Sequence, residues 1–477
     1  MRLLLVEIAP ADQRDARLTA GLGYIAAYVR REIPEVKVQI IKGDPTWVER
    51  AVKEYHPEVV GLSTVSQYYC MAVEAADICH RLGAFVVIGG HHVSALPGSM
   101  TPSMKLGVMG EGEDTMLDIC RTFLDKGPDR SAFAAIPGTA LLDGPGQSKP
   151  RSEHPQMRMN IPIVMGEPRP LHKSLDDFAF PARDLMHVRH GESVGIITSR
   201  GCPYRCVFCA SSAFWKRVRF HSAEYVVTEI KEVVERYRTP HIYFWDDLFV
   251  ADFERIKKIT ALLQHEPALK GTKFSCTCRA NLANDELARV LKEMNVIEVM
   301  IGFESMAPDT LRYLKPHVTV EHNRQAMRVF HQHEINVTGF FVIGSPKETH
   351  EEIEQTLDFV RTAPLYRAEA YLLTPLPGTP VWEYALQRGL IDPDNVPWER
   401  LYIDNPDDPK NGIYLSETMS AKDLRRYWHE FQRVRQRKDR INLLRRVPQH
   451  LAHFLQSPLG ELAIISEQLR TRRQGHI

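Results

Sequence analysis

Three cysteines lie close together in one short loop that follows a predicted strand. Cys202, Cys206 and Cys209 have the spacing C-x3-C-x2-C. Three thiols this close can converge on one centre but leave a fourth coordination position open. A structural zinc site takes four protein ligands, and no nearby His or Cys supplies the fourth. A [4Fe–4S] cluster held by three thiolates leaves one iron free, so the spacing predicts an iron–sulfur cluster that binds a small molecule.

The other five cysteines show no such spacing. Eight cysteines in 477 residues are too few for a disulfide scaffold. Cys70, Cys79 and Cys120 lie on predicted helices, where a buried cysteine acts as a small apolar residue. Cys276 and Cys278 are two residues apart on a predicted strand and therefore share a face. If that face lines a barrel, these two thiols can contact substrate or a second cofactor.

Composition and charge are those of an ordinary globular protein. Sixty basic residues balance sixty acidic ones, 44% of residues are hydrophobic and 25% are charged. This balance argues against a nucleic-acid-binding protein that depends on counterion release. The first residues lack the apolar core of a signal peptide, and no apolar run is long enough for a transmembrane helix. We therefore expect a cytoplasmic protein with reduced thiols.

Residues 1–125 alternate between short apolar strands and helices. Such a pattern predicts a parallel sheet covered on both faces, a doubly wound, Rossmann-like α/β domain. Ligands of these domains bind at the carboxyl ends of the strands. The loops of this domain are rich in glycine and polar residues, and the candidate binding residues are Gly21, Gly23, Ser63, Gly89, Gly90, Glu111, Gly112 and Glu113.

The rest of the chain divides into three further parts. Residues 126–190 lose the alternation and are rich in Pro, Gly, Asp and Arg, which predicts a linker. Residues 191–380 contain six strand–helix units in a row, which predicts a partial (β/α)6 barrel of the TIM type with its site at the strand carboxyl ends. Residues 381–477 look mainly helical. Their basic segment 433–446 is interpreted as a solvated helix face, with a docking surface as the alternative.

The cysteine spacing, on the loop after the first barrel strand, resembles the radical S-adenosylmethionine enzymes. The resemblance implies that the open iron binds the amino and carboxylate groups of S-adenosylmethionine and that an electron from the cluster releases a 5′-deoxyadenosyl radical. It also assigns candidate S-adenosylmethionine-binding residues, which are Phe208 beside the adenine, Asp246 and Asp247 for the amino group, Arg279, Glu304 for the ribose, and Gly344 on the segment that passes the adenine. Helix capping by one of the two aspartates and a plain salt bridge of Arg279 are the structural alternatives.

The first domain is similar to the cobalamin-binding domain of one group of these enzymes, so the resemblance spans roughly residues 1–380. It implies a corrinoid between the two domains, on the carboxyl edge of the first sheet. The stretch from Asp12 to Ala16 has no histidine where many cobalamin domains supply a cobalt ligand. His91 and His92 are possible substitutes, but their position after two glycines favours a role in shaping the loop.

Two reactions are compatible with this resemblance. The first is cobalamin-dependent methyl transfer from S-adenosylmethionine to an unactivated carbon or to phosphorus of a small molecule. The second is a radical reaction without methyl transfer, such as oxidative cyclisation, ring formation or carbon–carbon coupling. A non-catalytic iron–sulfur or corrinoid-binding protein is a third reading, against which the intact three-thiol motif argues. Either reaction needs an electron donor of the flavodoxin or ferredoxin type.

Overall fold

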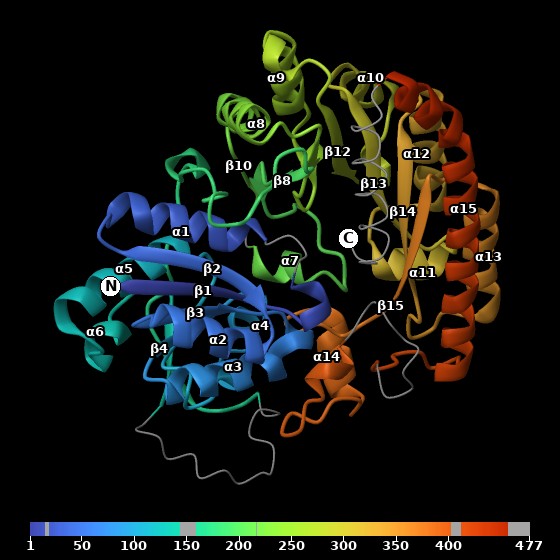
Figure 1. Cartoon of the computed structure of the whole chain (residues 1–477). Helices are drawn as coiled ribbons and strands as arrows, with labels where there is room; N and C mark the ends of the chain where they lie inside the picture. Colours follow the sequence, from blue (N-terminus) through green and yellow to red (C-terminus); the bar gives the residue numbers. More distant parts are fainter. Residues whose placement is uncertain (15–18, 144–158, 216, 402–411, 457–477) are drawn as a thin grey trace.

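Two β-sheets, each flanked by helices, organise the chain (Figure 1). The computed structural model describes residues 1–14, 19–143, 159–215, 217–401 and 412–456. The first sheet has the strand order β2-β1-β3-β4-β5-β6-β7. Its strands are β1 (Arg2–Ile8), β2 (Lys37–Gly43), β3 (Val59–Ser63), β4 (Phe85–Gly89), β5 (Leu106–Val108), β6 (Thr139–Leu142) and β7 (Ile163–Met165).

Strands β1 to β5 pair in parallel, as the alternating pattern predicts. The central strands β1 and β3 are buried along most of their length because helices cover both faces of the sheet. The helices are α1 (Ala20–Glu32), α2 (Pro45–Tyr55), α3 (Tyr69–Arg81), α4 (His91–Ala95), α5 (Glu113–Lys126) and α6 (Arg130–Ala134). The predicted doubly wound domain is confirmed.

The segment 126–190 forms more regular structure than a linker would. Helix α6 and the antiparallel strands β6 and β7 extend the first sheet beyond residue 125. The short strands carry too little hydrophobic periodicity to be recognised in the sequence. Downstream, the backbone N–H of Ala182 donates to the Gly23 carbonyl (3.0 Å), and Arg183 pairs with Glu229 of the second domain at 2.5 Å. Residues 144–158 of the predicted linker lie outside the described residues.

The second sheet is a six-stranded partial barrel. Its order is β15-β14-β13-β12-β11-β8, and all neighbouring strands are parallel. The strands are β8 (Val194–Ile196), β11 (His241–Phe244), β12 (Lys273–Cys278), β13 (Val296–Glu304), β14 (Asn336–Ile343) and β15 (Arg367–Leu372). The helices that follow them are α8 (Ala223–Tyr237), α9 (Phe253–Gln264), α10 (Asp285–Glu293), α11 (Pro308–Leu314), α12 (Val320–Gln332) and α13 (His350–Thr362). The predicted partial barrel is confirmed.

The C-terminal region serves both domains. Helix α14 (Pro380–Gln387) brings Trp382 into the first domain's core, where its ring stacks on Trp398 at 6.1 Å between centroids. Helix α15 (Ala421–Gln456) runs along the edge strand β15. There the Trp428 indole donates to the Ala370 carbonyl (3.1 Å), and Arg435 pairs with Glu369 (2.6 Å). Helix α15 therefore protects the edge of the open barrel. Residues 402–411 and 457–477 lie outside the described part.

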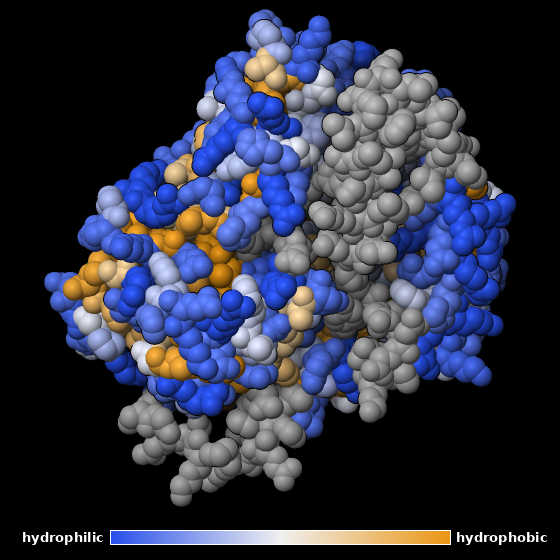
Figure 2. All heavy atoms as spheres, in the orientation of Figure 1, coloured by the Kyte–Doolittle hydropathy of each residue, from blue (hydrophilic) through white to orange (hydrophobic). Residues whose placement is uncertain are grey.

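The basic segment 433–446 is only partly a solvated helix face, because two of its basic side chains contact the second domain. Besides the Arg435 pair, the Lys438 ammonium donates to the Ala363 carbonyl at 2.8 Å. The side chains of Arg445 and Arg446 lie outside the described part. Helices on the face shown in Figure 2 are largely hydrophilic, and the apolar surface atoms gather mainly over the first domain. Among the described helices, none combines the length and the apolar character needed to cross a membrane.

Candidate active site

The cysteine loop is closed at its base by two very short strands. Strand β9 (Ser199–Arg200) pairs antiparallel with β10 (Arg219–Phe220), and the loop between them includes helix α7 (Ala210–Phe214). Gly201 begins the loop at φ +92°, and a Cβ there would lie 2.8 Å from the Arg217 carbonyl oxygen. Only glycine takes this left-handed conformation without strain. In Figure 1 the loop and α7 lie between the two sheets.

The three candidate ligands share this loop and one electrostatic environment. Cys202, Cys206 and Cys209 are all partly buried, and their charges interact with one another and, for Cys202 and Cys209, with Asp247. Burial raises the pKa of Cys202 to about 11 and also raises that of Cys209, so iron must displace the thiol protons. Among the described residues no three Cys, His, Asp or Glu side chains close around a single ion. Cluster cysteines bind separate irons, so this donor set fits a cluster.

The two predicted aspartates after β11 have different surroundings. Asp246 is 3% exposed and accepts hydrogen bonds from the Thr198 N–H and hydroxyl (2.7 Å each) and from the Ser199 N–H (2.5 Å). It therefore fixes the start of the cysteine loop and has no free oxygen for the amino group of S-adenosylmethionine. Asp247 is exposed and interacts electrostatically with two of the cysteines. Of the two aspartates, the geometry leaves only Asp247 able to bind a ligand.

Arg279 follows β12 and reaches the cysteine loop. Its guanidinium donates to the Cys206 sulfur (3.4 Å), the Pro316 carbonyl (2.7 Å) and Asn281 Oδ1 (3.0 Å). It also lies 3.9 Å from the centroid of the Tyr204 ring. With 4% of its surface exposed, Arg279 is positioned to support the loop. Among the described residues Arg279 forms no plain salt bridge, and its contact with S-adenosylmethionine stays a prediction.

Glu304 ends β13 in an unusual conformation. Its φ is +60°, rare for a residue with a side chain, and it forms a buried ion pair with Lys315 (3.0 Å). The same ammonium donates to the Gly302 carbonyl (2.5 Å). A Cβ on Gly302 would meet both members of this pair, at 2.2 Å and 2.8 Å. The Glu304 carboxylate is therefore already paired with Lys315. It can bind a ribose hydroxyl only while it keeps this ion pair.

The end of the fifth barrel strand is held by a carboxylate that the sequence analysis did not identify. Gly344 has φ +89°, and its N–H donates to Glu348 Oε2 (2.6 Å). The Ser345 N–H donates to the same oxygen (3.2 Å). Glu348 is 1% exposed, and burial raises its pKa to about 8. It therefore shapes the turn that carries Gly344.

We expect the buried Glu348 carboxyl to make stability fall as pH rises. Its pKa is 4.5 in the unfolded chain and about 8 in the folded protein. Between these values the folded state holds a proton that the unfolded state has lost, so up to about 1.4 kcal/mol is lost per pH unit. Thermal unfolding at pH 5 and pH 8 measures this loss, which Glu348→Gln should reduce. An equal loss in both proteins would contradict the prediction.

The carboxyl edge of the first sheet carries three of the predicted cobalamin-binding residues. Ser63 ends β3, Gly89 ends β4, and Gly90 follows at φ +98°. A Cβ on Gly90 would lie 2.8 Å from the Thr64 carbonyl oxygen and 3.3 Å from the Ser63 hydroxyl, so this edge is a close-packed turn. Ligands of doubly wound sheets bind at this edge, so the contact of these residues with the corrinoid stays a prediction.

The two histidines after Gly90 differ in role. His92 is buried, hydrogen bonds to Ser66 (2.9 Å) and Ser99 (3.1 Å), and has its pKa lowered to about 3 by burial. It shapes the loop, as the sequence favours. The ring of His91 lies 4.4 Å from that of Phe214, on α7 of the cysteine loop. His91 thus marks where the first domain meets this loop.

The other candidates of the first domain differ in their surroundings. A Cβ on Gly23 would lie 2.5 Å from Met186 Sδ, and one on Gly112 would lie 2.8 Å from Ile25 Cδ1, whereas Gly21 is open. Glu111 and Glu113 are engaged in ion pairs with Arg200 and Arg219, which flank the cysteine loop. Both carboxylates therefore make contacts between domains, and a cofactor contact of either one stays a prediction.

Phe208 and the strand thiols lie in packed surroundings. Phe208 packs against the core that includes Trp382, and the N–H of the preceding Val207 donates to the Leu314 carbonyl (3.2 Å). Cys276 and Cys278 are 0% and 5% exposed within the core of the second domain. Lone residues such as Lys315 and Glu348 carry no local signal, so sequence reasoning missed them.

Comparison with known proteins agrees with both domains. Residues 196–360 match the model of the radical SAM superfamily, and residues 18–119 match that of the B12 binding domain. An uncharacterized methyltransferase of Pyrococcus horikoshii is 30% identical over 410 residues, 82% of this chain and 84% of that protein. Cytidylyl-2-hydroxyethylphosphonate methyltransferase of Streptomyces wedmorensis is 24% identical over 440 residues, 80% of each.

Solved structures share the fold. The radical S-adenosylmethionine methyltransferase TsrM from Kitasatospora setae, with cobalamin and a [4Fe–4S] cluster bound, superposes with a TM-score of 0.67 at 17% identity, covering 91% of this chain and 88% of that one. The two domain matches and the 30% identical relative agree with the site geometry. The chain belongs to the radical SAM superfamily, among the enzymes with a B12-binding domain, whose cofactors are a [4Fe–4S] cluster, S-adenosylmethionine and cobalamin.

Proposed function

We propose that this enzyme transfers a methyl group from S-adenosylmethionine to an unactivated carbon or to phosphorus of a small molecule. The observation that carries this proposal is the contact of the cysteine loop with the carboxyl edge of the first sheet, made by the rings of His91 and Phe214. This contact brings the radical-generating loop and the corrinoid edge to one place. The relatives named as methyltransferases, one of which acts on a phosphonate by name, support the same reaction.

Within this proposal each side chain has a defined task. Cys202, Cys206 and Cys209 hold the cluster, and Asp247 binds the ammonium group of S-adenosylmethionine. Ser63, Gly89 and Gly90 form the turn against which the corrinoid lies. When bound, the cluster and S-adenosylmethionine supply a 5′-deoxyadenosyl radical, and cobalamin supplies a methyl carrier. Asp246 holds the start of the cysteine loop, and Glu348 holds the turn at Gly344, which the resemblance places beside the adenine.

The reaction also needs a reductant and a reducing compartment. We infer a low-potential donor of the flavodoxin or ferredoxin type, because cleavage of the sulfonium consumes an electron. None of the eight cysteines forms a disulfide. Free thiols and an oxygen-sensitive cluster persist in a reducing environment, so the cytoplasm is the proposed location.

Anaerobic reconstitution tests the proposed reaction. The full chain is loaded with iron, sulfide and hydroxocobalamin, and then incubated with methyl-labelled S-adenosylmethionine and dithionite. We expect retained iron and cobalt, S-adenosylhomocysteine, and label in the corrinoid fraction. No cobalt after supplementation would refute methyl transfer. Deoxyadenosine without S-adenosylhomocysteine would instead favour a radical reaction that transfers no methyl group.

We expect Arg279→Lys to lower the reduction potential of the cluster. Arg279 donates to the sulfur of Cys206, and a hydrogen bond to a ligand sulfur stabilises the more negative, reduced cluster. The three acceptors are served by three different guanidinium nitrogens, and the single nitrogen of a lysine ammonium cannot reproduce this geometry. A redox titration followed by electron paramagnetic resonance measures the change, with Asn281→Ala, which keeps the guanidinium, as the control. An unchanged potential in Arg279→Lys would contradict the prediction.

A further inference from the structure

Two arginines face each other at the base of the cysteine loop. Arg200 of β9 and Arg219 of β10 are register partners across this two-strand ribbon. Each is only 7% exposed. Like charges directly opposite each other on an antiparallel pair are destabilising, and burial strengthens the repulsion. The ribbon therefore needs an external negative charge to close the loop.

The neutralising charges come from the other domain. Glu111 Oε1 lies 2.6 Å from Arg200 Nη1 and also 2.6 Å from Arg219 Nη2. Glu113 Oε1 lies 2.6 Å from Arg200 Nη2. Burial by itself would raise the pKa of Glu111. The hydrogen bonds and positive charges of the two arginines outweigh burial, so the pKa is lowered overall and the carboxylate is ionised. Among the carboxylates that the structure describes, Glu111 alone bridges both strands of the ribbon.

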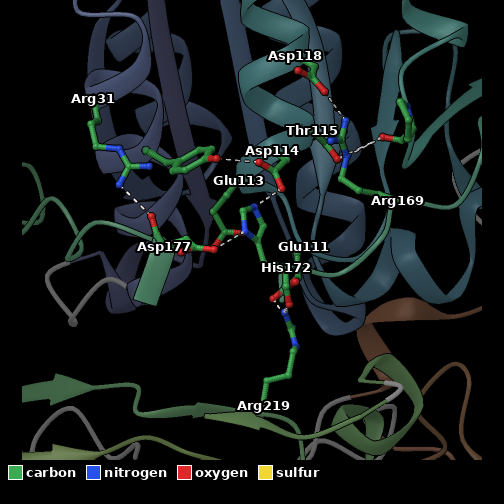
Figure 3. A network of polar contacts seen from close by, with 12 residues as sticks. Arg31, Glu111, Glu113, Asp114, Thr115, Asp118, Arg169, His172, Asp177 and Arg219 are labelled. Carbon is green, nitrogen blue, oxygen red and sulfur yellow. Dashed lines mark hydrogen bonds and ion pairs between the residues drawn. The ribbon is translucent and has the colours of Figure 1, made fainter. Parts of the chain in front are cut away.

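Other residues of the first domain and of the segment 126–190 surround the two arginines. The Arg200 guanidinium lies 5.1 Å from the Tyr24 ring centroid and 4.8 Å from that of Phe178. His172 pairs with Asp114 at 2.5 Å, and its carbonyl accepts from Arg219 at 3.4 Å. Figure 3 shows Glu111 aimed at Arg219, with His172 and Asp114 beside it. The arginine pair is thus held by residues outside its own domain.

We propose that Glu111 is a positioning residue for the cluster: by neutralising Arg200 and Arg219 it closes the base of the cysteine loop, so the B12-binding domain sets the geometry of the cluster site. The proposal rests on the proposed function only in taking the cysteine loop as the cluster loop. It assigns the Gly110-Glu111-Gly112-Glu113 segment a task other than cofactor binding. The cysteine loop therefore reaches its cluster-binding geometry only when the first domain is docked against it.

The test compares four variants of the full chain with the wild type after anaerobic reconstitution. Glu111→Gln leaves both arginines charged and opposed. Arg219→Gln removes the opposition while Arg200 keeps both carboxylates. The double variant Glu111→Gln/Arg219→Gln leaves Arg200 paired with Glu113. Asp118→Asn is the matched control, because it breaks the 2.5 Å ion pair with Arg169 without touching the loop.

Two readouts report the loop itself. The first is the shift of the reduced cluster's electron paramagnetic resonance spectrum when S-adenosylmethionine is added. The second, independent of any cofactor, is the rate of tryptic cleavage after Arg205, which is exposed within the loop. We expect Glu111→Gln to cut the shifted fraction and speed cleavage by at least about tenfold, as breaking a buried ion pair implies. Arg219→Gln, the double variant and Asp118→Asn should stay within about threefold of the wild type, a difference below 1 kcal/mol.

The outcomes separate this proposal from the proposed function. Wild-type values in Glu111→Gln would overturn it, and so would a double variant no better than Glu111→Gln. If Glu111→Gln does not fold, the comparison of Arg219→Gln with the wild type decides. A strong loss of the shifted spectrum in Arg219→Gln would contradict charge neutralisation, and wild-type values would support it. A wild type that makes no S-adenosylhomocysteine would refute methyl transfer, while tryptic cleavage would still report on the loop.

Discussion

Replacing Cys206 by alanine is expected to abolish deoxyadenosine formation from S-adenosylmethionine. The loop offers three thiols, and removing one leaves two ligands for a cluster that needs three protein thiolates and an open iron. Cys206 is also the thiol that receives the Arg279 hydrogen bond at 3.4 Å, so its loss leaves a buried guanidinium without that acceptor. Iron and sulfide analysis and chromatography of the dithionite-driven reaction measure both effects. We expect product below the detection limit.

A second cysteine variant, Cys70→Ala, is the control that distinguishes loss of a cluster ligand from loss of a packed thiol. Cys70 is partly buried, as Cys206 is, but it lies on α3 with its sulfur 3.9 Å from Glu399 Oε2. Cys70→Ala should keep the cluster and full deoxyadenosine formation. Retention of the cluster in Cys206→Ala would refute its assignment as a ligand. Equal loss in both variants would show that the assay reports general damage to the protein.

The sequence was sufficient where the signal is local. The spacing of the three cysteines and the alternation of apolar strands with helices predicted the cluster loop, the parallel sheets and the order of the two domains. These features depend on neighbours along the chain and on periodicity, which are visible without coordinates. The candidate residues after the barrel strands came instead from the resemblance to radical S-adenosylmethionine enzymes, and barrel geometry supports them only in that all carboxyl ends of a parallel barrel meet on one side.

The sequence was insufficient where a partner is remote. Glu111 meets Arg200 and Arg219 across 89 and 108 residues of chain, and no local pattern links them. A glutamate in a glycine-rich loop therefore looked like a cofactor contact. Lys315, which occupies Glu304, was invisible for the same reason. The short strands β6 and β7 were missed because four and three residues carry too little hydrophobic periodicity to be recognised.

The adjacent aspartates Asp246 and Asp247 provide the last test, because the resemblance assigns both the same role. Asp246→Ala removes the acceptor of three hydrogen bonds that hold Thr198 and Ser199 at the start of the cysteine loop. Unsatisfied buried donors should cost about 3 kcal/mol or more of unfolding free energy, and the cluster should be lost with the loop. Denaturant unfolding and iron analysis measure the two losses.

Asp247→Ala should behave in the opposite way. The Asp247 side chain is exposed and the structure gives it no hydrogen bond, so the free energy of unfolding should change by less than about 0.5 kcal/mol and the cluster should remain. Loss of one charged contact to the ammonium group should weaken binding of S-adenosylmethionine by about tenfold or more. A titration of the cluster spectrum with S-adenosylmethionine measures this. Reversed results, with Asp246→Ala stable and Asp247→Ala unfolded, would refute the division of roles, which depends on the side of the strand end toward which each carboxylate points.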